Sequence, residues 1–433
     1  MGRRQQLQDA LRDAAGRPQQ WLDRNEVRLP VGDAEAIATL QRIGCEEPCE
    51  FDAAALWGEV VRLYQGGLHP AIGLTIFHRG RCVLDRTIGH VAHHPGQAPG
   101  PVVELDTPFN LFSASKIVTA TLIHALVEDH LIDLDKRVDH YLPGFGSHGK
   151  EHIRVRHLLN HTAGIPDMPR DVDVEAALRS GQVPLESLYA LRPKWEPGSA
   201  HAYHPITSWV LLQQIAEQVS GQGLQALLRA RLLQPAGLSA MGYGVPADQV
   251  HRVAQHTTTG VPAPKLMADI FARTIGVGLE RAVELTNSPA FLTAVLPSAN
   301  VCGTGREVCA FLQLLLGGGR AVDGSRVLQT RTIERAVTDV TPVRLDGTFG
   351  FPMRYGLGMM MGGMRFSLFG LNTRGAFGHL GFTGVVVYAD PVRQLAVAFL
   401  NTGKPMLAPG MVRWYWILQR LTMVVPRGQA PWR

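Results

Sequence analysis

The chain has 433 residues, of which 45% are hydrophobic and 18% are charged, a composition typical of a soluble globular protein and not of a disordered one. The net charge of +5 is small for this length, and no basic stripe with interleaved aromatic residues occurs, so we expect no nucleic-acid partner. The 46 glycines and 28 prolines predict a mixed fold with many turns.

Residues 1–50 form a polar, Gln/Arg-rich segment, which we expect to be an N-terminal extension that is helical in part. Its basic start is followed by Asp9 and Arg12 and lacks the apolar core of at least ~7 residues that a signal peptide needs. No uninterrupted apolar run of ~18 residues occurs in the sequence. We therefore expect no stable membrane insertion and a cytoplasmic location.

A helix and a hairpin follow this extension. Apolar residues recur at helical spacing through 51–65, as in Leu56, Val60 and Tyr64. Two apolar runs, 71–77 and 82–84, flank a turn that contains Gly80, which predicts a β-hairpin. Amphipathic helices then dominate from about 111 to 235, and another helix is predicted at 306–316, where it ends in three glycines.

The last third of the chain is β-like. Strands are predicted at 355–361, 384–388 and 395–400, and a final helix at 409–425. Residues 246–300 are the hardest to assign: a His/Thr/Pro-rich stretch is followed by a helix-like segment with few capping residues, and no motif is found there. We identify no internal repeat.

Strands thus occur near both ends of the chain, and helices fill the middle. Two or three strands at either end would be too few to bury a core alone. The pattern therefore predicts one sheet shared by both chain ends, with a mostly helical domain inserted between them. We place the main domain at 51–425, with an α/β part at about 51–130 and 335–425 and the helical insertion at about 131–334.

Ser113 and Lys116 are the first candidates for chemistry. Their i, i+3 spacing puts both side chains on one face of a helix. The N-terminus of a helix offers free amides and a partial positive charge, which favour an oxyanion. A lysine buried there has a lowered pKa and can act as a base. By itself, the spacing also fits a serine that caps a helix followed by a surface lysine.

Four segments, the first of which contains Ser113 and Lys116, occur in a recognisable order, and they decide between these two interpretations. The stretches 107–116, 153–166, 300–308 and 378–384, followed by Asp390-Pro391, resemble motifs of the serine β-lactamase and penicillin-binding-protein superfamily. The resemblance extends over roughly 55–420 and is greatest to the class C-like branch that includes the family VIII esterases. It implies a β-lactamase/transpeptidase-like α+β fold, with an antiparallel sheet, a helical insertion and the site in the cleft between them.

The resemblance assigns a second motif, Tyr-x-Asn, to residues 203–205. It implies that Tyr203 shares the Ser113 proton with Lys116 as a third catalytic residue. The asparagine position holds Pro205, which cannot bind the amide of a β-lactam side chain. His204, beside Tyr203, is a candidate for orienting the phenol.

A third motif is read at His379, Leu380 and Gly381, where β-lactamases have Lys-Thr-Gly. The resemblance implies that the backbone amides of Ser113 and Phe382 form an oxyanion hole. His379 is a substrate-binding candidate that is mostly neutral at pH 7, so it suits an uncharged ester better than a carboxylate-bearing substrate. Simple lining of the cleft is the alternative role for His379.

These residues predict a serine hydrolase that acts through an acyl-enzyme on a small ester or related acyl substrate, most simply as a carboxylesterase or acyl transferase. A β-lactamase or D-Ala-D-Ala peptidase is the alternative within the superfamily. A catalytically weak, structural or self-assembling homologue is the alternative of another class. The sequence does not indicate the oligomeric state.

The cysteines point to no cofactor. Five of them occur at irregular spacing, which argues against a disulfide framework. Cys45 and Cys49 lie four residues apart, but no second pair with metal-ligand spacing accompanies them. We expect free thiols, no metal and no cofactor.

Overall fold

The computed structural model describes residues 27–406 and 409–430. Its centre is a seven-stranded sheet in the order β1-β3-β2-β14-β13-β12-β9, in which every pair of neighbours is antiparallel. The strands are β1 (Gln41–Cys45), β2 (Ala71–His78), β3 (Arg81–Gly89), β9 (Met360–Met361), β12 (Phe377–Leu380), β13 (Val386–Asp390) and β14 (Leu395–Asn401). β2 pairs with β14, which confirms that both chain ends build one sheet.

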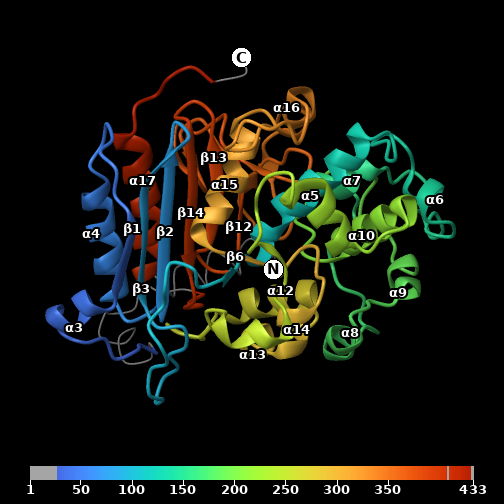
Figure 1. Cartoon of the computed structure of the whole chain (residues 1–433). Helices are drawn as coiled ribbons and strands as arrows, with labels where there is room; N and C mark the ends of the chain where they lie inside the picture. Colours follow the sequence, from blue (N-terminus) through green and yellow to red (C-terminus); the bar gives the residue numbers. More distant parts are fainter. Residues whose placement is uncertain (1–26, 407–408, 431–433) are drawn as a thin grey trace.

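Helices cover both faces of this sheet (Figure 1). α4 (Ala53–Tyr64) and α17 (Pro409–Val424) pack together on one face, and α15 (Gly305–Leu316) packs against β2, β13 and β14 on the other. α15 buries one apolar stripe that includes Phe311, Leu312 and Leu315, as expected for a helix that lies on a sheet.

Two of these elements lie outside the segments predicted for the α/β part. β1 belongs to the range 1–50, yet it pairs with β3, so the sheet begins within the supposed extension. α15 belongs to the range 131–334, yet it packs on the sheet instead of within the helical insertion. The predicted strand at 355–361 is reduced to the two residues of β9. Any helix within 1–26 lies outside the described residues.

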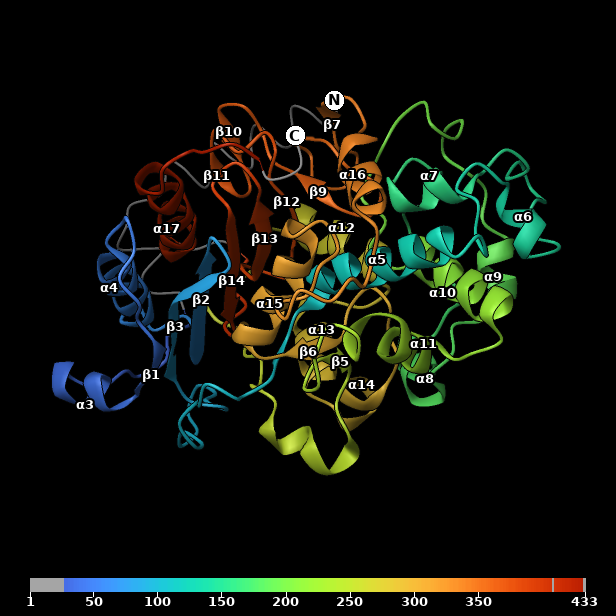
Figure 2. The ribbon, with the colours of Figure 1, turned by 45° about the horizontal axis from the view of Figure 1, so that its top comes forward.

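The remaining helices form the second part of the molecule (Figures 1 and 2). They are α5 (Ser115–Glu128), α6 (Val138–Tyr141), α7 (Val155–Leu159), α8 (Val174–Ser180), α9 (Leu185–Tyr189), α10 (Thr207–Ser220), α11 (Leu224–Leu228), η2 (Arg229–Leu233), η3 (Ala247–Arg252), α12 (Lys265–Ile275), α13 (Leu279–Thr286), α14 (Pro289–Thr293) and α16 (Thr330–Thr338). α3 (Ala34–Thr39) lies apart from them, before β1. Residues 246–300, in which the sequence indicates one helix-like segment, contain four of these helices.

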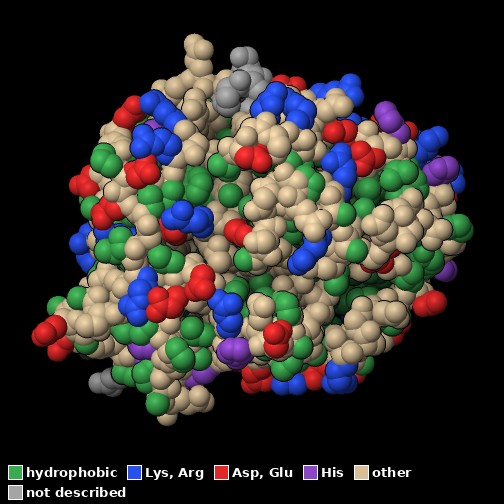
Figure 3. All heavy atoms as spheres, in the orientation of Figure 1, with side chains coloured by type: hydrophobic (Ala, Val, Ile, Leu, Met, Phe, Trp, Pro, Cys, Tyr) green, Lys and Arg blue, Asp and Glu red, His purple; other side chains and the backbone are tan. Residues whose placement is uncertain are grey.

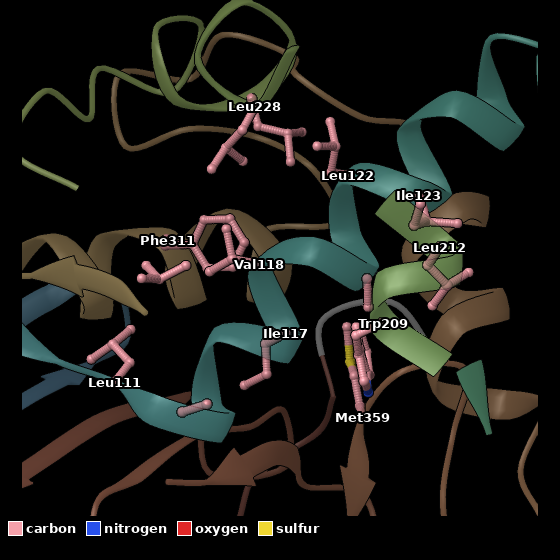
Figure 4. Packing of buried hydrophobic residues seen from close by; sticks show 14 of the residues in the cluster. Leu111, Ile117, Val118, Leu122, Ile123, Trp209, Leu212, Leu228, Phe311 and Met359 are labelled. Atoms are coloured by element: carbon pink, nitrogen blue, oxygen red, sulfur yellow. The ribbon is translucent and has the colours of Figure 1, made fainter. Parts of the chain in front are cut away.

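α5 is the central helix of this second part. Every residue from Ser115 to Leu126 is buried, so the helix is enclosed on all sides. Figure 4 shows its apolar side chains among those of Trp209, Leu212 and Phe311, all in one hydrophobic cluster. The N-terminus of α5 is therefore held in a fixed place beside the sheet.

Three small sheets complete the fold: β4 (Phe109–Asn110), β5 (Gly242–Tyr243) and β6 (Val301–Gly303); β7 (Arg344–Leu345) and β8 (Pro352–Met353); and β10 (Phe366–Ser367) and β11 (Gly370–Leu371). On the face shown in Figure 3, basic and acidic side chains are interspersed, with no continuous basic stripe. Within the described residues, no helix combines the length and apolar composition needed to cross a membrane.

Candidate active site

Ser113 lies in a short 3-10 turn, η1 (Phe112–Ala114), that leads directly into α5. The turn is sharp: Phe112 has a φ of 48°, which is unusual for a residue with a side chain. It is held because the Phe112 N–H donates to Asn110 Oδ1 at 3.0 Å and the Leu111 N–H donates to the Val301 carbonyl at 2.9 Å. Ser113 remains partly exposed between buried neighbours. The backbone thus presents this serine at the surface of an otherwise closed core.

Lys116 lies one helical turn further on, as the spacing predicts. Its Nζ is 3.2 Å from Ser113 Oγ and 3.0 Å from the Ser298 carbonyl. The side chain is fully buried, with the rings of Tyr203 and Trp209 at 5.1 and 5.5 Å from Nζ. Burial lowers the pKa of Lys116 well below its usual range, and no carboxylate offsets that effect. The amine is therefore poised to be neutral beside the serine.

Tyr203 closes the other side of this pair. Its side chain is buried, and no described residue forms a hydrogen bond of ordinary geometry with its hydroxyl. Burial raises the pKa of the phenol well above its usual range, and the Ser113 hydroxyl beside it opposes that rise. The Tyr203 ring stacks on Phe349 at 4.9 Å and lies 5.6 Å from the His379 ring. The phenol is thus protonated and close to Ser113.

His204 has a different partner from the one we expected. Its Nε2 accepts a hydrogen bond from the Ile165 N–H at 3.0 Å, and among the described residues nothing joins its ring to the Tyr203 phenol. The His204 N–H in turn donates to His161 Nδ1 at 3.1 Å. The His161 ring, 4.9 Å from that of Tyr203, is the one that packs on the tyrosine. His204 therefore fixes the loop that carries His161.

The third motif lies on β12 and the turn after it. His379 is buried, and its Nδ1 lies 2.6 Å from the Leu380 carbonyl, so that nitrogen carries the proton. Its Nε2 has no partner among the described residues. Burial lowers the pKa of His379 to about 3. The imidazole is accordingly neutral at pH 7.

Gly381 brings this turn against the nucleophile segment. A Cβ at this position would lie 2.5 Å from the Leu111 carbonyl oxygen, a distance that no real side chain tolerates. The Gly381 N–H donates to the Val385 carbonyl at 2.7 Å, whereas no described group accepts from the Phe382 N–H. An amide hydrogen that none of the described residues accepts therefore remains beside the η1 turn.

Comparisons with known proteins identify the family of this chain. The sequence matches the family described as Beta-lactamase over residues 60–422. The chain belongs to this family. It is 28% identical over 347 residues to the esterase/β-lactamase LipL of Mycobacterium tuberculosis, which covers 78% of this chain and 77% of LipL.

Two solved structures are similar to this chain in fold. A family VIII carboxylesterase matches with a TM-score of 0.75 and 25% identity, over 88% of this chain and 99% of that one. A penicillin-binding-protein homologue from Caulobacter crescentus matches with a TM-score of 0.74 and 23% identity, over 88% and 100% of the two chains, and shows the shared fold. The predicted superfamily and fold class are thereby confirmed, and the chain is a serine hydrolase of the β-lactamase superfamily.

In this member of the Beta-lactamase family, two rows of aromatic rings flank the site. Tyr203 stacks on Phe349, which stacks on Phe351 at 5.5 Å, and both phenylalanines are 38% exposed. On the other side, Phe382 lies 5.6 Å from Phe112 and is 5.2 Å from Phe271 of α12. Sequence reasoning missed these rows because they join segments that lie far apart in the chain.

No metal or disulfide chemistry is built into the described part of the chain. No group of three or more His, Cys, Asp or Glu side chains within it is placed to hold a metal ion. All five cysteines lie within it, and each is free.

Proposed function

We propose that this Beta-lactamase family member is a serine esterase in which Ser113 is the nucleophile and Lys116 the general base. The observation that carries the proposal is the buried Lys116 Nζ, 3.2 Å from Ser113 Oγ, with no carboxylate to keep it charged. A neutral amine at this distance takes the Ser113 proton as Oγ attacks the ester carbonyl, and a tetrahedral intermediate forms.

Opposite pKa shifts support a separate acid for the second proton transfer. Burial lowers the pKa of Lys116 and raises that of Tyr203, so the base and the acid are different residues. When the intermediate collapses, Tyr203 gives its proton to the departing alcohol oxygen and recovers one from Lys116. Water then repeats the sequence on the acyl-Ser113 ester and releases the acid.

The oxyanion of both intermediates is bound by the backbone N–H groups of Ser113 and Phe382. The contact between Gly381 and Leu111 supports this pairing, because it brings the third-motif turn against the η1 turn. The unused Phe382 N–H supports it as well. One such donor stabilises the transition state by about 3 kcal/mol.

The substrate is a small uncharged ester with an apolar or aromatic group. A neutral His379 replaces the third-motif lysine, and Pro205 replaces the asparagine. Phe349 and Phe351 offer an apolar wall that continues from Tyr203 to the surface. Two relatives, an esterase/β-lactamase and a family VIII carboxylesterase, agree by their names with ester hydrolysis.

Ser113→Ala tests this proposal. We expect the variant to lose hydrolysis of p-nitrophenyl butyrate and labelling by a fluorescent fluorophosphonate. Ser208→Ala is the matched control, because it removes a buried serine hydroxyl that has no hydrogen-bond partner within the described part of the chain, and it should retain both. Undiminished hydrolysis by Ser113→Ala would overturn the mechanism. Labelling of the wild-type protein by a fluorescent penicillin, with no ester turnover, would favour a penicillin-directed activity instead.

A further inference from the structure

Besides Lys116, another buried lysine contacts the nucleophile turn. Lys404 follows β14, and its side chain is fully buried. Its Nζ donates to the Phe382 carbonyl at 3.0 Å, to the Asn401 carbonyl at 3.0 Å and to Asn401 Oδ1 at 3.4 Å. It also lies 4.7 Å from the centre of the Phe112 ring. The amino group of Lys404 thus contacts the nucleophile turn, the third-motif turn and the central sheet.

The backbone of Lys404 is itself fixed. Its N–H donates to the Thr257 carbonyl at 2.8 Å. The preceding Gly403 leaves no room for a side chain, because a Cβ there would lie 1.7 Å from the Leu68 carbonyl oxygen. Because its own backbone is fixed, Lys404 can restrict the movement of the groups to which it binds.

The groups that Lys404 holds flank both proposed oxyanion donors. Phe112 precedes Ser113 in η1, and the Phe382 carbonyl belongs to the residue whose N–H is the second donor. A hydrogen bond to that carbonyl restricts rotation about the Phe382 Cα. The next residue, Thr383, has a φ of 41°, so this turn is one that needs support.

We propose that Lys404 is a positioning residue that aligns the Phe382 N–H with the Ser113 N–H in the oxyanion hole. This inference rests on the proposed function, since it presumes Ser113 as the nucleophile. Lys404 does not contact the reacting atoms. It acts through Phe382 and Phe112, and preorganised donors of this kind stabilise the transition state more than the bound substrate.

Lys404→Met tests the proposal, and Lys150→Met is its matched control. Lys150 is buried in the same manner: its Nζ donates to three carbonyls, those of Ser147, Tyr189 and Leu191, and lies 5.3 Å from the Phe145 ring. It lies in the helical part, away from Ser113. Both variants lose one buried amino group and the same kind of contacts, so their thermal midpoints should fall by similar amounts.

We expect Lys404→Met to lower kcat for p-nitrophenyl butyrate by about tenfold or more, with KM within about twofold. The affinity for phenylboronic acid, which forms a tetrahedral adduct with a reactive serine, should fall in parallel with kcat. Lys150→Met should change neither quantity. If Lys404→Met does not fold, Lys404→Gln, which keeps one donor group, should show the same split to a smaller extent.

A kcat for Lys404→Met equal to that of Lys150→Met would overturn the positioning role, and so would a loss that appears only in KM. Activity that persists in Ser113→Ala would instead overturn the proposed function. An inactive Ser113→Ala beside a fully active Lys404→Met refutes the inference about Lys404 alone.

Discussion

Tyr203→Phe removes only the phenol hydroxyl, and we expect it to lower the catalytic rate without lowering the free energy of unfolding. This hydroxyl is buried and has no hydrogen-bond partner of ordinary geometry among the described residues. An unsatisfied buried hydroxyl costs about 1–3 kcal/mol, so Tyr203→Phe should leave the free energy of unfolding unchanged or raise it. Activity should fall about 10²-fold or more, because the proposed proton transfer to the leaving alcohol is lost. That factor corresponds to about 2.7 kcal/mol of transition-state stabilisation.

Two esters with different leaving groups test the role of Tyr203 as the acid. p-Nitrophenolate leaves readily without a proton, whereas an alkoxide does not, so kcat/KM should fall more for ethyl butyrate than for p-nitrophenyl butyrate. Tyr388→Phe is the control: its hydroxyl is also buried without a described partner, but its ring stacks on Phe369, within the sheet part. The two variants should unfold alike in urea and differ in rate. Equal losses on both esters, or full activity of Tyr203→Phe, would refute the assignment of Tyr203 as the acid.

Two further predictions concern the base and the oxyanion turn. The value of kcat/KM should rise with pH through the lowered pKa of Lys116, because only the neutral amine accepts a proton. His379, with a pKa of about 3, should add no second change of kcat/KM near pH 6. A change near pH 6 that His379→Gln removes would contradict this. Gly381→Ala forces a Cβ to within 2.5 Å of the Leu111 carbonyl oxygen and should abolish fluorophosphonate labelling, whereas Gly278→Ala, with open space around its Cβ, should not.

The central sheet was predictable because its inner strands are continuously apolar. All residues of β2 and β14 are buried, and such runs stand out in a sequence. β1 was missed because it is an edge strand whose residues are all half-buried or exposed, so no hydrophobic pattern marks it. The predicted strand at 355–361 was too long because Gly358 has a φ of 93° and lies against Ala120 of α5. Contacts between distant segments decided both cases.

The candidate site also contains a part that the sequence predicts and a part that it does not. The spacing of Ser113 and Lys116 places both on one helical turn, so a local rule sufficed for this pair. The packing of His161 on Tyr203 and the bonds of Lys404 to Phe382 join segments more than 20 residues apart. No local pattern encodes them. His204 shows the reverse error, because adjacency to Tyr203 in the chain does not place its imidazole near the phenol.

A single physical cause accounts for the chemistry proposed at this site. Removal from water makes Lys116 a base and keeps Tyr203 an acid, and it also leaves His379 neutral. A carboxylate beside Lys116 would hold it charged and cancel the first of these effects. The rings of Tyr203 and Trp209 against Nζ exclude water without supplying such a charge. The same absence of fixed charge favours uncharged esters, so the activation of Ser113 and the choice of substrate follow from the burial of one amine.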